Sequence, residues 1–152
     1  MNLNKRELIG LSIGTAGFVA ITGKMNFAYA AAEPTIDDLI KTFTGGAAIE
    51  QGKVNLTSPQ IAESGYTVPI SVRVDSPMSA DNFVVEVMIL ADGNPNPEVA
   101  TFKFSALSGT AEASIRIRLA KTQNILAIAK MNDGTYFMAK NAVEVTIGGC
   151  GS

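Results

Sequence analysis

From Gln51 onward the sequence has short strand-like runs that are separated by turn signals, and from residue 66 hydrophobic and polar residues alternate within these runs. The clearest run, Ala113–Leu119, turns its aliphatic residues to one face and Ser114, Arg116 and Arg118 to the other. A period of two places successive side chains on opposite sides of a strand, so this run predicts a half-buried β-strand. Asp133-Gly134 supplies a hairpin turn, because this pair tolerates the positive φ angles that such turns require.

The same pattern recurs along the chain. The predicted strands are Tyr66–Val74, Phe83–Leu90, Val99–Ala106, Ala113–Leu119, Asn124–Lys130, Tyr136–Ala139 and a last strand that ends at Ile147, with Val143, Val145 and Ile147 as its core face. Strands spaced by roughly 8–12 residues, with no long helix between them, favour an all-β antiparallel sandwich over an α/β fold. A small barrel is the alternative.

One short helix is predicted ahead of the strands, over Pro34–Thr44. Thr35 is placed to cap its first turn, and Gly45-Gly46 ends it. Its apolar residues recur at helical spacing and form one stripe, made of Ile36, Leu39, Ile40 and Phe43. The stripe fits packing on the sandwich and packing on a partner equally well.

The first thirty residues have the three-part order of an export signal. Lys5 and Arg6 precede an apolar run over residues 8–21, and Ala28-Tyr29-Ala30 offers a cleavage site after Ala30, with Ala32 as second choice. The apolar run is shorter than the roughly 20 residues of a membrane span, which argues against an anchor. Both a twin-arginine-like signal and a plain Sec signal fit. The expected organisation is 1–30 signal, 31–147 sandwich and 148–152 arm.

Composition excludes several kinds of function. The chain has no histidine and one cysteine, which rules out Ser-His or Cys-His nucleophile pairs, His-ligated metal and an internal disulfide. Removing the signal reduces the twelve basic and fourteen acidic residues to nine and thirteen. A mildly acidic chain gives no argument for nucleic acid or anionic membrane as a partner. No cofactor or metal is expected.

The last five residues, Gly148-Gly149-Cys150-Gly151-Ser152, contain no side chain that can pack a core. Glycines cost much entropy to order, so the segment is predicted to be a mobile arm that carries Cys150 on the order of 10 Å beyond the fold. No basic residue next to Cys150 favours its thiolate, so a partner's pocket must activate it. A covalent carrier, an intermolecular disulfide and an incidental free thiol remain open.

The tail Val145–Ser152 resembles the C-terminus of the SoxY family of thiosulfate-oxidation carriers, whose members end in a Gly-Gly-Cys-Gly-Gly-type arm. Ser152 departs from that pattern, and its small side chain should affect the arm little. Three more segments resemble the family in the same order along the chain: Ser76–Met78, Asn94–Phe102 and Ile115–Gln123.

The resemblance implies an immunoglobulin-like sandwich that pairs with SoxZ in the periplasm. It implies that Cys150 is the covalent site, delivered by Gly148, Gly149 and Gly151. The haem enzyme SoxAX would couple thiosulfate to it, the hydrolase SoxB would release sulfate, and the sulfane dehydrogenase SoxCD, where present, would oxidise the remaining sulfur. The chain itself would not be an enzyme.

Two further interpretations stay open from the sequence. Arg116 and Arg118 share one strand face and are either a docking patch for acidic partners or an ordinary solvated face. For the protein as a whole, the alternative to a carrier is an exported structural sandwich that uses its one cysteine to form a covalent dimer.

Overall fold

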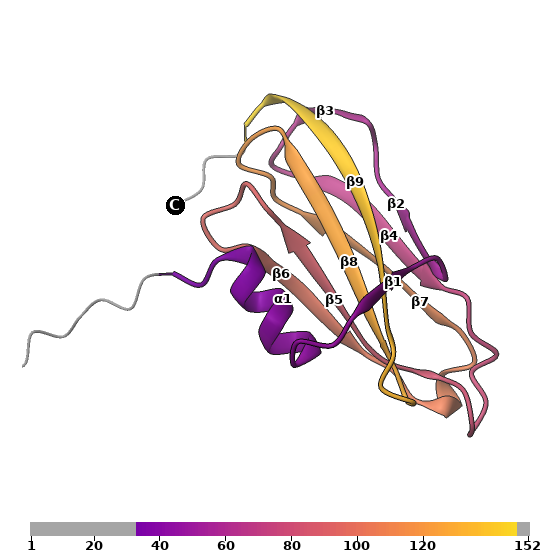
Figure 1. Cartoon of the computed structure of the whole chain (residues 1–152). Coiled ribbons are helices and arrows are strands. Elements are labelled where there is room, and N and C mark those ends of the chain that lie inside the picture. Colours follow the sequence, from indigo (N-terminus) through magenta and orange to yellow (C-terminus); the bar gives the residue numbers. More distant parts are fainter. Residues whose placement is uncertain (1–32, 149–152) are drawn as a thin grey trace, which may run out of the picture. The chain divides into compact units, whose positions relative to one another are not determined.

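The computed structural model describes residues 33–148, so the predicted export signal and Cys150 lie outside the described residues. One helix and two β-sheets make up the described domain (Figure 1). The elements in chain order are α1 (Ile36–Thr44), β1 (Ile49–Gln51), β2 (Val54–Thr57), β3 (Ile61–Ser64), β4 (Val68–Val74), β5 (Val84–Ala91), β6 (Glu98–Lys103), the short 3-10 turn η1 (Ala106–Ser108), β7 (Ala111–Ile117), β8 (Gln123–Met131) and β9 (Tyr136–Ile147). The predicted all-β sandwich is confirmed.

The larger sheet has the strand order β1-β9-β8-β5-β6, and β3 pairs with the far part of β9. Its central strand β8 is apolar on both faces, which explains the unbroken run from Ile125 to Ala129. Ile125, Ala127 and Ala129 enter the main core, whereas Leu126 and Ile128 join a second cluster on the other face. Strand β8 therefore contributes to two separate apolar clusters, one on each face of the larger sheet.

Helix α1 covers the outer face of the larger sheet. Its apolar stripe packs on a cluster formed by Met88, Leu90, Leu126, Ile128 and Tyr136. Phe43 meets Tyr136 edge to face, with ring centroids 5.9 Å apart. The stripe therefore packs on the sandwich, which settles the choice that the sequence left open.

The ends of α1 are set by local contacts, as predicted. The Thr35 hydroxyl accepts from the Asp38 amide at 3.3 Å, and the Asp38 carboxylate accepts from the Thr35 amide at 3.2 Å. The same two residues share a hydroxyl–carboxylate hydrogen bond, which is the main cause that lowers the pKa of Asp38 below its usual value. Gly45 ends the helix at a φ of 64°, a conformation that favours glycine.

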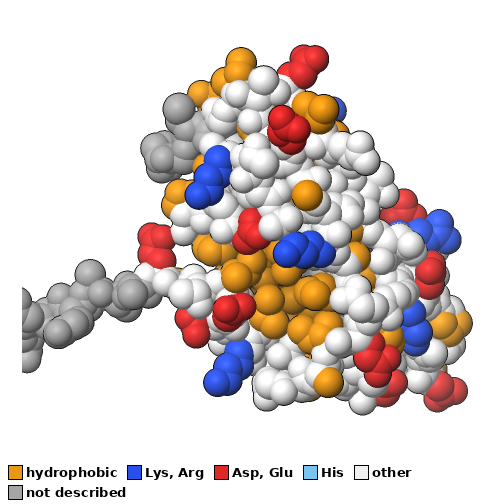
Figure 2. Space-filling view, turned by 45° about the horizontal axis from the view of Figure 1, so that its top comes forward, with side chains coloured by type: hydrophobic (Ala, Val, Ile, Leu, Met, Phe, Trp, Pro, Cys, Tyr) orange, Lys and Arg blue, Asp and Glu red, His pale blue; other side chains and the backbone are white. Residues whose placement is uncertain are grey.

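Beside α1 the outer face keeps some apolar surface. Figure 2 shows hydrophobic side chains gathered on the face that carries the helix, with charged side chains around them. Leu39, Phe43 and Met88 line a groove there, between α1 and strands β5 and β6, together with Glu86, Glu98 and Lys103.

The smaller sheet has the order β2-β4-β7 and closes the sandwich. Val68, Ile70, Val72 and Val74 of β4 are all buried against the inner face of the larger sheet. Residues between them, such as Pro69 and Arg73, are exposed. The alternation predicted for this strand is confirmed.

Three features differ from the sequence expectation in detail. The short strands β1, β2 and β3 were not predicted, and β1 and β3 pair with β9 in parallel. The last two predicted segments are one continuous strand, β9. Ile147 was expected in the core, yet its side chain is 64% exposed because β9 runs past the end of the sandwich. That expectation was wrong.

Candidate functional site at the root of the tail

The C-terminal tail leaves the domain at the end of β9, beside the segment that joins β3 to β4. Ser64 pairs with Ile147, and the amide of Gly65 donates to the carbonyl of Ile147 at 2.7 Å. Gly148 is the last described residue. Gly149, Cys150 and Gly151, which the sequence assigns to the arm, lie outside the described residues, so their assignment stays a prediction.

Gly148 lies directly against the backbone of Ala120, which follows β7. A Cβ atom built on Gly148 would overlap the Ala120 carbonyl oxygen, and backbone cannot move aside as a flexible side chain can. This position therefore requires glycine for space. The sequence suggested a different reason, the mobility of the whole 148–152 segment.

The Ala120 segment is in turn held by Asn94, from the loop between β5 and β6. The Asn94 side chain donates to the Arg118 carbonyl at 2.8 Å and accepts from the Ala120 amide at 2.9 Å. Its oxygen also accepts from Gln123 Nε2 at 2.8 Å. We call Asn94, Ala120 and Gln123 the root clasp, because together they fix the backbone on which Gly148 rests.

Further hydrogen bonds join the clasp to the β5–β6 loop, to β9 and to the segment between β3 and β4. Gln123 is 6% exposed, and its Oε1 accepts from the Gly93 amide at 2.7 Å. Thr122 Oγ1 accepts from the Val145 amide at 2.9 Å, which joins the clasp segment to β9. The Leu119 amide donates to the Gly65 carbonyl at 2.8 Å. Three separate parts of the chain therefore converge where the tail begins.

The surface beside the root carries Arg118 and Tyr66. The Arg118 guanidinium lies over the Tyr66 ring, 5.6 Å from its centroid, and both side chains are exposed. Arg116 lies two residues earlier on β7 and lines a shallow groove across β4 and β7 with Pro69 and Ser71. Both predicted arginines are thus accessible, and only Arg118 lies next to the tail.

Among residues 33–148 the root offers no acid–base pair to activate a thiol. The titratable groups whose pKa values are clearly shifted are Asp38 and Asp133, both lowered chiefly by a side-chain hydrogen bond to a threonine. Asp38 lies in α1 and Asp133 in the β8–β9 turn. Within the same residues, no group of three potential ligands is placed to hold a metal ion. No helix there is long and apolar enough to cross a bilayer.

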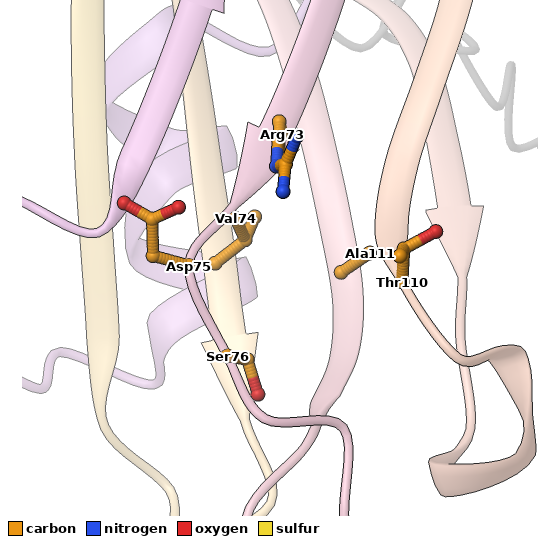
Figure 3. A pocket seen from close by; sticks show the side chains of 6 residues that line it. All are labelled: Arg73, Val74, Asp75, Ser76, Thr110 and Ala111. Carbon is orange, nitrogen blue, oxygen red and sulfur yellow. The ribbon is translucent and has the colours of Figure 1, made fainter.

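The pocket in Figure 3 lies where β4 ends and β7 begins. The β4–β7 register places this pocket, at Val74 and Ala111, opposite the Val68–Ile117 end that borders the tail root. Its polar side chains do not converge, and Asp75 already accepts a hydrogen bond from Asn55 at 3.0 Å. We assign no reaction to it.

The clasp residues carry no recognisable signal in the sequence, although Asn94, Ala120 and Gln123 lie in segments that resemble the SoxY family. Asn94 begins one of these segments, and Gln123 ends another. An amide side chain next to a proline is ordinary turn chemistry. No local signal tells that Asn94 bonds to residues 24 to 29 positions away.

A Gly148→Ala substitution should lower the free energy of unfolding by about 1–3 kcal/mol, as overpacking does, because its methyl group overlaps the Ala120 carbonyl. Denaturant unfolding of the mature chain measures this. A spin label on Cys150 should also report an altered distribution of positions relative to the domain. Gly149→Ala is the matched control, since equal losses in both variants would assign the effect to tail flexibility instead.

Comparison with known proteins shows which family the sequence matches. The family model described as "Sulfur oxidation protein SoxY" matches residues 40–150, which is more than half of the chain. No sequence among curated proteins matches this one.

Solved structures with a similar fold include a member of the same family. The sulfur carrier protein SoxY from Chlorobium limicola f thiosulfatophilum is similar, with a TM-score of 0.63 and 28% identity over 73% of this chain and 91% of that chain. A superoxide reductase (neelaredoxin) from Ignicoccus hospitalis has a TM-score of 0.55 at 19% identity, over 75% and 95% of the two chains. At that identity, the second likeness concerns the fold alone.

Proposed function

The chain belongs to the SoxY family of sulfur-oxidation proteins, and from that premise we propose that it carries sulfur intermediates covalently on Cys150. A carrier role in sulfur oxidation follows from the family and from the similar SoxY structure. The observation that carries the finer proposal is the extent of the family match, which runs to residue 150 and so includes the single cysteine.

The geometry of the tail root supports delivery from a defined point. The clasp fixes the backbone under Gly148, and only Gly149 separates Gly148 from Cys150. A short tether on a fixed base would restrict the positions that the thiol can reach. A reactive adduct on such a tether can enter another protein's site without being released to solvent.

The loading step forms one S–S bond between Cys150 Sγ and the outer sulfur of thiosulfate. The thiol loses its proton, and two electrons pass to the haem partner, SoxAX, as the acceptor. The hydrolase SoxB then breaks the bond between the outer sulfur and the sulfonate by adding water. Sulfate and two protons leave, and one sulfur remains on Cys150 for the dehydrogenase SoxCD where that partner exists.

We further propose that the chain works as a heterodimer with SoxZ in the periplasm, after removal of residues 1–30. In this proposal the chain presents its substrate and the partners supply the catalysis. Activation of the thiol would then come from the partner's pocket, because nothing adjacent in sequence favours the thiolate.

Intact-mass spectrometry without reductant tests the proposal. Protein taken from thiosulfate-oxidising cells should carry one thiosulfonate or sulfane group on Cys150, and a thiol reductant should remove it. A spectrum that shows only a disulfide-linked homodimer of this chain would instead support the structural alternative, and an unmodified monomer under active turnover would count against both.

A further inference from the structure

We propose that Tyr66, Arg118 and Ile147 form a docking patch for the rim of a partner enzyme's active-site entrance. These three residues are called the root patch. The inference rests on the proposed function, since only a carrier has to deliver Cys150 into another protein's site. It adds the surface by which the carrier and the enzyme recognise each other.

Two of the three root-patch residues, Tyr66 and Ile147, are large hydrophobic side chains that the fold leaves exposed. Among the described residues, the large hydrophobic side chains that are exposed are Ile61, Tyr66, Leu107 and Ile147. Tyr66 and Ile147 stand at the origin of the tail, joined through Gly65, whose amide donates to the Ile147 carbonyl at 2.7 Å. Exposed apolar residues that gather at one place mark interaction sites more often than scattered ones do.

The length of the tail makes contact at this place unavoidable. Cys150 is two residues beyond Gly148, and two residues span at most about 7 Å even when fully extended. An enzyme that takes the thiol into a recessed pocket must therefore bring the mouth of that pocket close to Gly148. Ile147 precedes Gly148 directly, and Arg118 is held two residues before the Ala120 carbonyl on which Gly148 rests.

The chemistry of the patch defines the surface it fits. Tyrosine and arginine are enriched among the residues that dominate binding energy, because each offers a large flat group with polar atoms at its edge. Here the Arg118 guanidinium already lies over the Tyr66 ring, so the pair presents one preformed surface with a positive charge. The occupant is a ring of apolar residues opposite Tyr66 and Ile147, with a carboxylate opposite Arg118.

Binding of the hydrolase partner, measured by surface plasmon resonance, tests the patch without covalent chemistry. Every variant is made in the full mature chain with Cys150→Ser, and each is measured as the complex with its proposed partner subunit SoxZ. Ile147→Ser and Arg118→Glu are compared with Leu107→Ser. Leu107 is 97% exposed and lies in η1, before the β7 end that is remote from the tail. Thermal unfolding confirms that each variant is folded.

Each root-patch variant should bind about tenfold more weakly, a loss typical of a residue that contributes strongly to an interface, and Leu107→Ser should bind as the parent does. Equal affinities for all variants, or an equal loss in Leu107→Ser, would overturn the patch. A parent chain that does not bind the hydrolase would overturn it as well. The carrier function is judged separately, by mass spectrometry of Cys150.

Discussion

Replacing Cys150 with serine is expected to abolish covalent loading by thiosulfate and, with it, thiosulfate oxidation by the reconstituted partners. A hydroxyl group cannot form the S–S bond on which the adduct depends, and the chain has no second cysteine to replace it. The fold should be unaffected, because Cys150 lies beyond the end of β9. Intact mass, the rate of thiosulfate oxidation and the midpoint of denaturant unfolding measure the three effects.

A relocated thiol provides the matched control for this loss. Leu107→Cys in the Cys150→Ser background places an exposed cysteine in η1, on the rigid domain. A small thiol reagent should modify it, yet the partners should not load it, because it is not carried on the tail. Oxidation that persists in Cys150→Ser, or that Leu107→Cys restores, would show that the tail cysteine is not the covalent site.

Elements that depend on local chemistry could be predicted from the sequence. Helix α1 begins and ends where Thr35 and Gly45 place it, and its stripe faces the cluster around Leu126. The alternation of β4 and β7 and the doubly apolar β8 also predicted strands whose faces are now seen in two cores. In each case the signal lies within about ten residues of the chain, at a period that one element imposes.

Elements that depend on distant partners could not be predicted. Strands β1 to β3 are three or four residues long, too short for a periodic signal, and two of them exist through parallel pairing with β9. The polar stretch around Asn141 hid the continuity of β9, although Asn141 is used there to bind the Leu56 carbonyl at 2.7 Å. The sequence predicts Cys150 as the covalent site, which stays a prediction, and it gives no signal for the clasp under Gly148.

The clasp itself provides the second large effect. An Asn94→Ala substitution is expected to lower the free energy of unfolding by about 2–4 kcal/mol, because it removes three hydrogen bonds at once. The Arg118 carbonyl and the Ala120 amide lose the partner that holds them, whereas Gln123 keeps a bond to the Lys121 carbonyl at 3.1 Å. Denaturant unfolding of the mature chain measures the change.

Asn96→Ala is the matched control, because it tests whether any asparagine substitution in the β5–β6 loop has the same effect. Asn96 lies two residues further along the same loop and is exposed, so its removal should change stability by no more than about 0.5 kcal/mol. Equal losses in the two variants would contradict a clasp centred on Asn94. Because Ala120 bounds the space around Gly148, Asn94→Ala should also broaden the positions of a spin label on Cys150, and Asn96→Ala should not. If both the unfolding free energy and the spin-label distribution change only in Asn94→Ala, the clasp controls the positions that residue 150 can reach.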